Sequence, residues 1–598
     1  MALRIISLRD EINFPMQNAA VAQMFDEIAA YLEITGENPF KIRAYRRAAE
    51  AIATYNAPIE DAAEAGILEE IEGLGPATAE KTREFLATGK VRYLERLKEQ
   101  YPASLLELLR VPNLGPKRIA QLYQERHISS IEELKAALES GALEGLAGFG
   151  PKTLQNIRSG LARMAQMTTR LPLDDGLALA GRLVIELLKS EEAVAVEVAG
   201  SLRRGCDTIG NINLVAEVAQ EEDAPPLIEE FIALPSVLTV EEQTLDKAHV
   251  RVHSGLEVHL YCALTENFGA ALFHATGSAL HVLTAEQRAA ARGLRLDRTG
   301  LYRGDERLAG ECEADIYEAL GVPFIAPELR EDRGEWEAAD EGKLPQLIKV
   351  DDLRGDLHAH STWSDGAVSI RQMVLAARER GYSYLAITDH SKALAMANGL
   401  NADRLREQAN EIAEVQAEFP DFKILRGVEC DILRDGTLDL DDDILHELDI
   451  VVASVHSGFN LDEATQTARM IRALSHPAVD IVAHPTGRVL GVRPGYEVDV
   501  SALIAAARDT GTALEINASE RLDLRDTHAR EARDAGVLLA IDSDAHSQRM
   551  LPNVAYGVLT ARRAWCRPSD ILNTKTTEEL LQWLNRPQSR PWMPPRAR

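Results

Sequence analysis

The stretch GSLRRGCDTIGNINLV, residues 200–215, is a Gly-Ser turn followed by two arginines, a second turn and an apolar run typical of a buried strand. Two amide side chains, Asn211 and Asn213, stand one residue apart where that strand begins. An amide oxygen offers coordination geometry without charge, whereas pairs of Mg²⁺ ions beside a phosphate chain need anionic oxygens. The stretch therefore indicates a polar turn beside a strand with poor metal ligands.

Length and composition bound the class of protein. The chain has 598 residues, which is too long for one hydrophobic core, so we expect several domains. It has no long apolar run and no signal-peptide pattern, which predicts a cytoplasmic protein without a membrane span. The five cysteines are scattered, without a CxxC pair, as expected in a reducing compartment.

The charge of the chain is unevenly distributed. A net charge of −29, taken alone, argues against a nucleic-acid-binding protein, which needs Lys and Arg for phosphate contacts. However, FKIRAYRR (40–47) is strongly basic, and ELREDRGEWEAADEG (328–342) is mostly acidic. Because the sequence pattern changes after the acidic stretch, we expect an inter-domain linker at 326–352. The Pro- and Arg-rich end at 587–598 is predicted to be disordered.

A near-repeat of an apolar residue, Gly-Pro and a helix start occurs three times in the N-terminal half. The copies are EGLGPATAEKTREFL (72–86), PNLGPKRIAQLY (112–123) and AGFGPKTLQNI (147–157). Glycine permits the tight turn, and proline opens the next helix without losing a backbone donor. The free amides at each helix start can face a phosphate, so this helix-hairpin-helix pattern predicts contacts with the DNA backbone. The alternative is that each turn only connects two helices and binds no DNA. The candidate contact residues are Gly73, Gly75, Gly115, Lys117, Gly150 and Lys152.

On these turns and on NPFKIRAYRRAAEAIA (38–53), the first half resembles a family X DNA polymerase. The resemblance implies an N-terminal extension at 1–15, a lyase-like domain at 16–95, fingers at 96–170, a nucleotidyltransferase-type palm at 171–265 and a thumb at 266–325. It implies that Lys41 and Tyr45 occupy the positions at which the family binds a 5′-phosphate. It also implies that Lys81 occupies the position of the family's Schiff-base lysine. Ala77 replaces a phosphate-binding lysine of the family. Abasic-site lyase activity is one interpretation of Lys81, and a solvated helix lysine is the other.

The palm signature of that family is Gly-Ser, two arginines, a short turn, Asp-x-Asp and a third Asp on a later strand. This chain keeps the turn, in which the resemblance implies that Ser201 and Arg204 hold phosphate. The three aspartate positions, however, hold Asn211, Asn213 and His259. Each lost charge–charge contact at about 4 Å is of order 4 kcal/mol at an effective dielectric of about 20. We therefore expect neither Mg²⁺ nor Mn²⁺ in the palm, and no templated synthesis. The nucleotide pocket also differs from the family, at His274, Ala275 and Val282.

The C-terminal half alternates short apolar strands, such as YLAITDH and LDIVVASVH, with helical segments, which predicts parallel βα units. It resembles the polymerase and histidinol phosphatase (PHP) domain over 353–575, a distorted (β/α)7-type barrel, with a C-terminal tail at 576–598. The shared motifs are DLHAHSTWSDG (356–366), AITDHS, GVECDI, SVHSG, AHPTG, EIN and DSDAH. Carried over position by position, they supply the metal-ligand candidates His358, His360, Asp365, His390, Glu429, His456, His484, Asp544 and His546.

These candidates follow the predicted strands, whose carboxyl ends meet at one mouth in a parallel barrel. Imidazole and carboxylate donors suit Zn²⁺, Mn²⁺ or Fe²⁺, and so many ligands imply two or three ions, with Glu429 or Asp544 as a bridge. Such ions would activate water and neutralise phosphate oxygens, which predicts phosphoester hydrolysis. Arg488, just after AHPTG, is a candidate for holding a substrate phosphate, or alternatively for a surface salt bridge.

The sequence thus predicts a monomeric, bacterial-type DNA-repair protein that binds gapped, nicked or damaged DNA. Its PHP domain is expected to act as a 3′→5′ exonuclease, 3′-end phosphoesterase or abasic-site endonuclease in base excision repair, beside a silent palm. Two alternatives stay open. One is a Mn²⁺-dependent gap-filling polymerase, and the other is a non-catalytic DNA-binding scaffold with structural metals.

Overall fold

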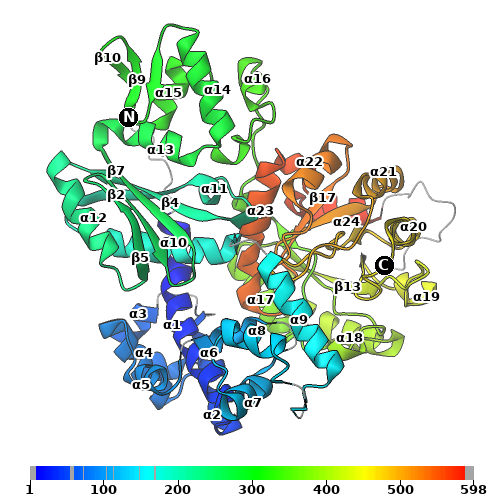
Figure 1. Cartoon of the computed structure of the whole chain (residues 1–598). Coiled ribbons are helices and arrows are strands. Elements are labelled where there is room, and N and C mark those ends of the chain that lie inside the picture. The colour runs from blue at the N-terminus through cyan, green and yellow to red at the C-terminus, as the bar shows by residue number, and fades with distance from the viewer. Residues whose placement is uncertain are drawn as a thin grey trace. The chain divides into compact units, whose positions relative to one another are not determined.

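The computed structural model of the chain describes residues 9–53, 55, 59–71, 73–102, 104–111, 114–143, 145–146, 148–166 and 170–585. The elements divide into two compact units, Met1–Thr169 and Arg170–Arg598 (Figure 1). The predicted disordered end at 587–598 lies outside the described residues, as does the start of the predicted N-terminal extension. Within the described ranges, no helix is both long and apolar enough to cross a lipid bilayer.

The first unit is a set of helices around two apolar cores, as its sequence predicts. Its longer helices are α1 (Arg9–Ile34), α2 (Pro39–Ala53), α4 (Pro76–Thr88), α5 (Arg92–Gln100), α7 (Pro116–Arg126), α8 (Ile131–Glu139) and α9 (Pro151–Gln166). Phe25 and Ile52 are fully buried in the first core, and Leu122 and Ile157 in the second.

The three Gly-Pro segments form the predicted corners between helices. Gly73 has a φ of +101°, and a Cβ there would lie 2.9 Å from the Cβ of Ala51, so the turn needs glycine. Gly75 and Gly115 cap α4 and α7, each with proline in the first turn, and Pro151 opens α9. Each corner thus presents a helix start with free backbone amides.

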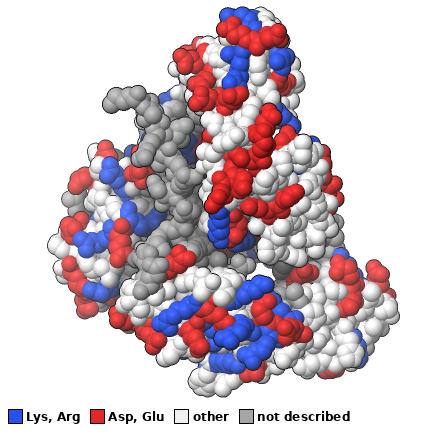
Figure 2. Space-filling model, turned by 90° about the vertical axis from the view of Figure 1, so that its left-hand side faces the viewer, with Lys and Arg blue, Asp and Glu red and all other residues white. Residues whose placement is uncertain are grey.

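Basic side chains gather on one part of the first unit. Figure 2 shows Lys and Arg clustered in the lower part of the view, in the region of α3 (Ile59–Glu64), α4 and α5. The side chains of Arg83 and Arg92 are 43% and 89% exposed. Each arginine has a glutamate beside it, Glu69 at 3.7 Å from Arg83 and Glu84 at 2.8 Å from Arg92, so this surface carries charges of both signs.

The palm in the second unit is a five-stranded sheet with the order β2-β4-β7-β6-β5. Its strands are β2 (Ala193–Ala199), β4 (Asn211–Val218), β5 (Val237–Gln243), β6 (Lys247–Val252) and β7 (Glu257–Leu264). Strands β4 and β7 run parallel, and the other pairs are antiparallel. Helices α10 (Leu173–Leu187) and α12 (Ala224–Ile232) bury Leu183 and Phe231 in the same core as strand residues such as Leu214.

The thumb includes the segment that the sequence predicts to be a linker. It contains α13 (Phe268–Thr276), α14 (Ala279–Ala290), α15 (Glu313–Ala319) and α16 (Glu335–Asp340), with a small antiparallel sheet. Trp336 and Arg330 are buried in it, and Arg330 donates to Glu313 at 2.6 Å. Glu335 bonds the buried His281 at 2.8 Å. The linker prediction at 326–352 is therefore wrong, because paired charges and an indole pack this acidic stretch into the thumb core.

The barrel has seven parallel strands that follow one another in chain order. They are β11 (Gly355–Asp356), β12 (Tyr384–Ile387), β13 (Lys423–Asp431), β14 (Ile450–Ser454), β15 (Ile481–Val482), β16 (Ala513–Asn517) and β17 (Leu539–Asp542). A parallel bridge between Ala359 and Ala545 links the segments that follow the first and last strands, so the barrel is nearly closed, as predicted. Helices connect the strands: α17 (Ile370–Glu379), α18 (Ala402–Glu418), α20 (Glu463–Leu474), α21 (Val500–Thr510) and α22 (Asp526–Asp534).

A final helix, α24 (Thr577–Leu584), lies in the segment predicted to be a tail. Leu580 and Leu584, four residues apart on one helix face, are buried against inner barrel residues such as Leu357 and Ile450. The tail prediction is therefore wrong for this helix, which covers one end of the barrel interior.

Palm and barrel share an interface within the second unit. Leu522, from the loop after β16, is 3% exposed and belongs to the palm core. On α23 (Val554–Arg563), Arg563 donates to the Arg204 carbonyl and to Glu331, both at 2.8 Å. The palm turn is thus fixed against the barrel by apolar packing and by buried ion pairs.

Candidate metal centre

The nine predicted metal ligands lie in one region, at the carboxyl ends of the barrel strands. Short loops after β11, β12, β14, β15 and β17 carry most of them, and Glu429 lies within β13. His358 and His360 are fully buried, whereas Asp365 is 37% exposed at the edge of the cluster. The parallel strand order brings these distant sequence positions together, as the sequence predicts.

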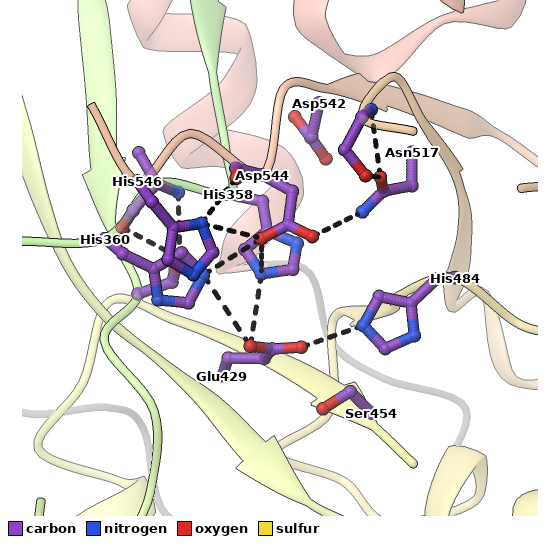
Figure 3. A network of polar contacts seen from close by, with 12 residues as sticks. His358, His360, Glu429, Ser454, His484, Asn517, Asp542, Asp544 and His546 are labelled. Atoms are coloured by element: carbon purple, nitrogen blue, oxygen red, sulfur yellow. Dashed lines mark hydrogen bonds and ion pairs between the residues drawn. The ribbon is translucent and has the colours of Figure 1, made fainter. Parts of the chain in front are cut away.

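Glu429 is the centre of the cluster (Figure 3). Its carboxylate lies 2.7 Å from His390 Nδ1, 3.0 Å from His484 Nε2, 3.3 Å from His456 Nε2 and 3.4 Å from His358 Nε2. One buried carboxylate therefore faces four imidazoles from four different loops.

Asp544 is the second buried carboxylate of the cluster. Its Oδ1 lies 3.1 Å from His360 Nε2 and 3.6 Å from His358 Nε2. Its Oδ2 accepts a hydrogen bond of 3.1 Å from Asn517 Nδ2. The amide thus fixes one oxygen and leaves the other facing the imidazoles.

The donor atoms form three overlapping groups, each with all its ligand atoms within 4.8 Å of one another. The groups are His360, Asp365, His390 and His546; His358, His360 and Glu429; and His390, Glu429 and His456. Several buried donors make no hydrogen bond, among them His358 Nε2, His360 Nδ1 and Glu429 Oε2. Because buried polar atoms are rarely left unpaired, and because the donors are imidazole and carboxylate, the residues fit two or three divalent transition-metal ions.

The ionisation of the cluster favours cations. Burial alone would raise the pKa of Glu429, but His456, His390 and His358 hold it well below its ordinary value. Burial would lower the pKa of His390, yet Glu429 and Asp365 raise it to about 10. The carboxylates are therefore ionised, and a metal that binds a protonated imidazole such as His390 must displace a proton from it.

Two residues behind the ligands orient them. Glu515 Oε1 lies 2.7 Å from His358 Nδ1, and Glu515 Oε2 accepts a bond of 2.6 Å from the backbone amide of His484. Asn517 Nδ2 also donates to Glu515, at 3.1 Å. Such partners fix the ring orientation of a ligand. The EIN motif was the signal for both residues, but sequence reasoning assigned neither a role.

Arg488 forms a salt bridge, which is the alternative that the sequence left open, but the pair links barrel and palm instead of lying on the surface. Its Nη1 lies 2.7 Å from Asp207 Oδ2 of the palm, and its Nε and Nη2 donate to the Leu522 carbonyl. The side chain is buried and its donors are used, so the expectation that it holds a substrate phosphate is corrected. Arg521 lies closer to the metal donors, with Nε 3.8 Å from Asp544 Oδ2. Sequence reasoning missed it because no motif position marks it.

The three palm positions at which the family carries aspartates lie close together, but they offer few metal ligands. In the parallel pair of β4 and β7, Asn213 lies opposite His259, and Asn211 lies opposite Glu257. His259 stacks on His249 with ring centroids 4.0 Å apart. The Glu257 carboxylate is 2.8 Å from Arg251. Within the described chain, the groups of donors that could hold an ion all lie in the barrel.

The palm turn is held by the thumb. Arg203 Nη2 lies 2.7 Å from Glu313, and Arg204 Nε lies 3.0 Å from Glu331. Arg204 Nη1 also donates to the Thr276 carbonyl. The arginine expected to hold phosphate is thus paired with a carboxylate, and the phosphate roles of Arg204 and Ser201 stay predictions.

Comparison with known proteins agrees with this architecture. Residues 16–91 match the Helix-hairpin-helix domain family, 105–163 the SAM-like Helix-hairpin-helix tandem, 271–331 the DNA polymerase beta thumb and 356–519 the PHP domain. The "DNA polymerase/3′-5′ exonuclease PolX" of Bacillus subtilis is 39% identical over 576 residues, which cover 96% of this chain and 100% of the relative. The chain belongs to the family X DNA polymerases that carry a C-terminal PHP domain.

The PHP half of this family X chain also has shorter relatives. A "Probable phosphatase" of Shewanella sediminis is 32% identical over 242 residues, 39% of this chain and 93% of the relative. One of Edwardsiella ictaluri is 30% identical over 254 residues, 40% of this chain and 96% of the relative. The helix-hairpin-helix and thumb domains imply DNA binding, and the PHP domain implies metal-dependent hydrolytic chemistry.

The lyase-like domain of this family X chain brings its three predicted residues together around Tyr93. Lys41 Nζ donates to Tyr93 Oη at 2.7 Å, and Lys81 Nζ lies 5.5 Å from the Tyr93 ring and 5.9 Å from the Tyr45 ring. Burial, and then Tyr93, raise the pKa of Tyr45 to about 12. Lys81 also donates to the Ala77 carbonyl at 3.1 Å. Sequence reasoning missed Tyr93, which no motif marks.

Proposed function

We propose that this chain is a DNA-repair phosphoesterase, whose PHP barrel hydrolyses phosphoester bonds at DNA 3′ ends while its palm is silent in synthesis. The observation that carries the proposal is the contrast between two sites. Around Glu429 the barrel assembles a complete set of buried imidazole and carboxylate donors, whereas β4 offers the amides Asn211 and Asn213. Phosphoryl and nucleotidyl transfer both need anionic metal ligands.

The barrel residues have different roles in the proposed hydrolysis. Divalent ions held there would supply a water of lowered pKa and would neutralise charge on the phosphate. Glu429 and Asp544 remain ionised to hold them, and Glu515 orients His358 and the His484 loop. Exonuclease hydrolysis adds water across the bond between phosphorus and the 3′ oxygen. The products are a strand with a new 3′ hydroxyl and a nucleoside 5′-monophosphate.

Features of the first unit support DNA as the substrate. Three Gly-Pro corners present helix starts, and exposed arginines lie near α4. The names of the relatives, an exonuclease and phosphatases, support 3′→5′ exonuclease and 3′-phosphatase activities, with abasic-site endonuclease as a third. All five cysteines are free, which supports a reducing, cytoplasmic setting for a role in base excision repair.

The direct test is hydrolysis of a 5′-labelled strand in a gapped duplex with Mn²⁺. We expect shortening by the purified protein, and a loss of at least about 100-fold in His360→Ala and Asp544→Ala proteins that stay folded. Circular dichroism and thermal unfolding monitor the fold. A variant that loses its metal and its fold together would instead support the scaffold alternative.

We also propose that Lys81 is a lyase nucleophile, because Lys41, Tyr45 and Tyr93 surround it. Its neutral amine would attack the sugar aldehyde of an abasic site and release water, which leaves an imine that borohydride reduces to a stable amine. We expect borohydride to trap the protein on abasic DNA, and Lys81→Ala to abolish the cross-link. The exposed Lys90→Ala is the matched control, and equal trapping of both variants would exclude the role.

A further inference from the structure

Three loops at the barrel mouth bring an aromatic ring and two arginines together. Phe459, Arg493 and Arg521 follow β14, β15 and β16, which are adjacent strands of the sheet. The second and third loops are joined by a hydrogen bond of 3.0 Å from the Leu490 amide to the Glu520 carbonyl, next to Arg521. The first loop begins with the ligand His456, so all three loops border the metal donors.

Arg493 is held in place without a carboxylate partner. Its Nε and Nη2 donate to the Gly487 carbonyl at 3.1 and 2.8 Å, and its guanidinium lies 4.2 Å from the Phe459 ring centroid. Phe459 in turn stacks on Tyr496 at 6.2 Å. In the described part of the chain, Arg493 makes no ion pair, and no bond is made by its Nη1. The guanidinium is therefore rigid, charged and available to an anion.

Arg521 adds a second cation beside the ligands. It makes no hydrogen bond to described residues, its side chain is 19% exposed, and its nearest carboxylate is Asp544, whose Oδ2 lies 3.8 Å from the buried Nε. Its charge, after burial, contributes to lowering the pKa of Arg493. Two neighbouring guanidinium groups next to a site for divalent cations repel each other and the ions unless an anion lies between them. A phosphate group is the anion that matches guanidinium geometry.

We propose that Arg521 and Arg493 form two successive phosphate subsites of a nucleic-acid strand, Arg521 for the phosphate at the metals and Arg493 for the next one. A monoester would use only the first subsite, so the second makes the mouth selective for oligonucleotides. The inference rests on the proposed phosphoesterase function and deepens it by naming the two residues that would select a nucleic-acid strand over a phosphomonoester.

The test compares substrates of one and of several phosphates. We expect Arg493→Ala to lower kcat/KM about 10- to 100-fold on a labelled oligonucleotide, mainly through KM, and less than about twofold on p-nitrophenyl phosphate, as expected for one lost charge-assisted contact. Arg521→Ala should lower both. Arg493→Lys, which keeps the charge, should restore part of the oligonucleotide activity. Arg508→Ala, an exposed arginine paired with Asp509, is the matched control.

A binding measurement keeps the inference separate from the proposed activity. Calorimetry should show weaker binding of 5′-phosphorylated thymidine dinucleotide to Arg493→Ala than to the unmodified protein, and equal binding of inorganic phosphate. If the unmodified protein hydrolyses nothing, the proposed function fails and this comparison still decides the subsite. Equal loss on both substrates, or unchanged dinucleotide affinity, would overturn the second subsite.

Discussion

Replacing Glu429 with glutamine is expected to lower metal-dependent hydrolysis by at least about 10³-fold, the largest effect of a single substitution in this chain. Glu429 faces four imidazoles within 3.4 Å and belongs to two of the three donor groups, so the amide removes one negative charge from both of these groups at once. One charge–charge contact at about 4 Å is of order 4 kcal/mol at an effective dielectric of about 20, which corresponds to about 10³-fold.

The measurement is hydrolysis of 5′-labelled gapped DNA, with metal content determined on the same protein. Glu418→Gln is the matched control, since this carboxylate lies 46% exposed and pairs with Arg371 away from the cluster. We expect the control to keep both metal and activity. Full hydrolysis by Glu429→Gln with undiminished metal content would remove Glu429 from the centre.

Restoring carboxylates in the palm should create a second metal site. The variant Asn211→Asp, Asn213→Asp, His259→Asp places three carboxylates on adjacent positions of β4 and β7. Their repulsion should lower metal-free stability by about 1–3 kcal/mol, and Mn²⁺ should restore it. In a Glu429→Gln background, we expect about one or two additional Mn²⁺ per chain.

Equilibrium dialysis and thermal unfolding with and without Mn²⁺ check this result. Conversion of the same three positions to alanine is the control, since it removes the native side chains without adding charge. If the aspartate variant binds no more Mn²⁺ than the control, the amides are not what keeps metal out of the palm.

Much of the architecture follows from the spacing of apolar residues and from the turn residues between them. The Gly-Pro corners, the alternating strands and the nine ligands each have a local signal, because turn chemistry and strand ends are encoded in neighbouring residues. The parallel order of the strands then brings His358 and His546 to one mouth although they are far apart in sequence.

The features that the sequence did not predict depend on partners distant in the chain. The acidic stretch at 328–342 suggested a linker, but in the thumb core Arg330 pairs with Glu313 and Glu335 is hydrogen-bonded to His281. Arg488 follows a ligand motif, yet its side chain turns to Asp207 of the palm. Only the packing of palm against barrel decides such orientations, and a single sequence does not encode it locally.

The most direct measurement follows one 5′-labelled primer in a gapped duplex with Mn²⁺, with and without deoxynucleotides, for the unmodified protein and Glu429→Gln in parallel. We expect the unmodified protein to shorten the primer whether or not nucleotides are present. We expect Glu429→Gln to leave the primer length unchanged in both conditions. Templated extension of the primer by either protein would contradict the proposal that the palm does not catalyse DNA synthesis. Continued shortening by Glu429→Gln would contradict hydrolysis in the barrel.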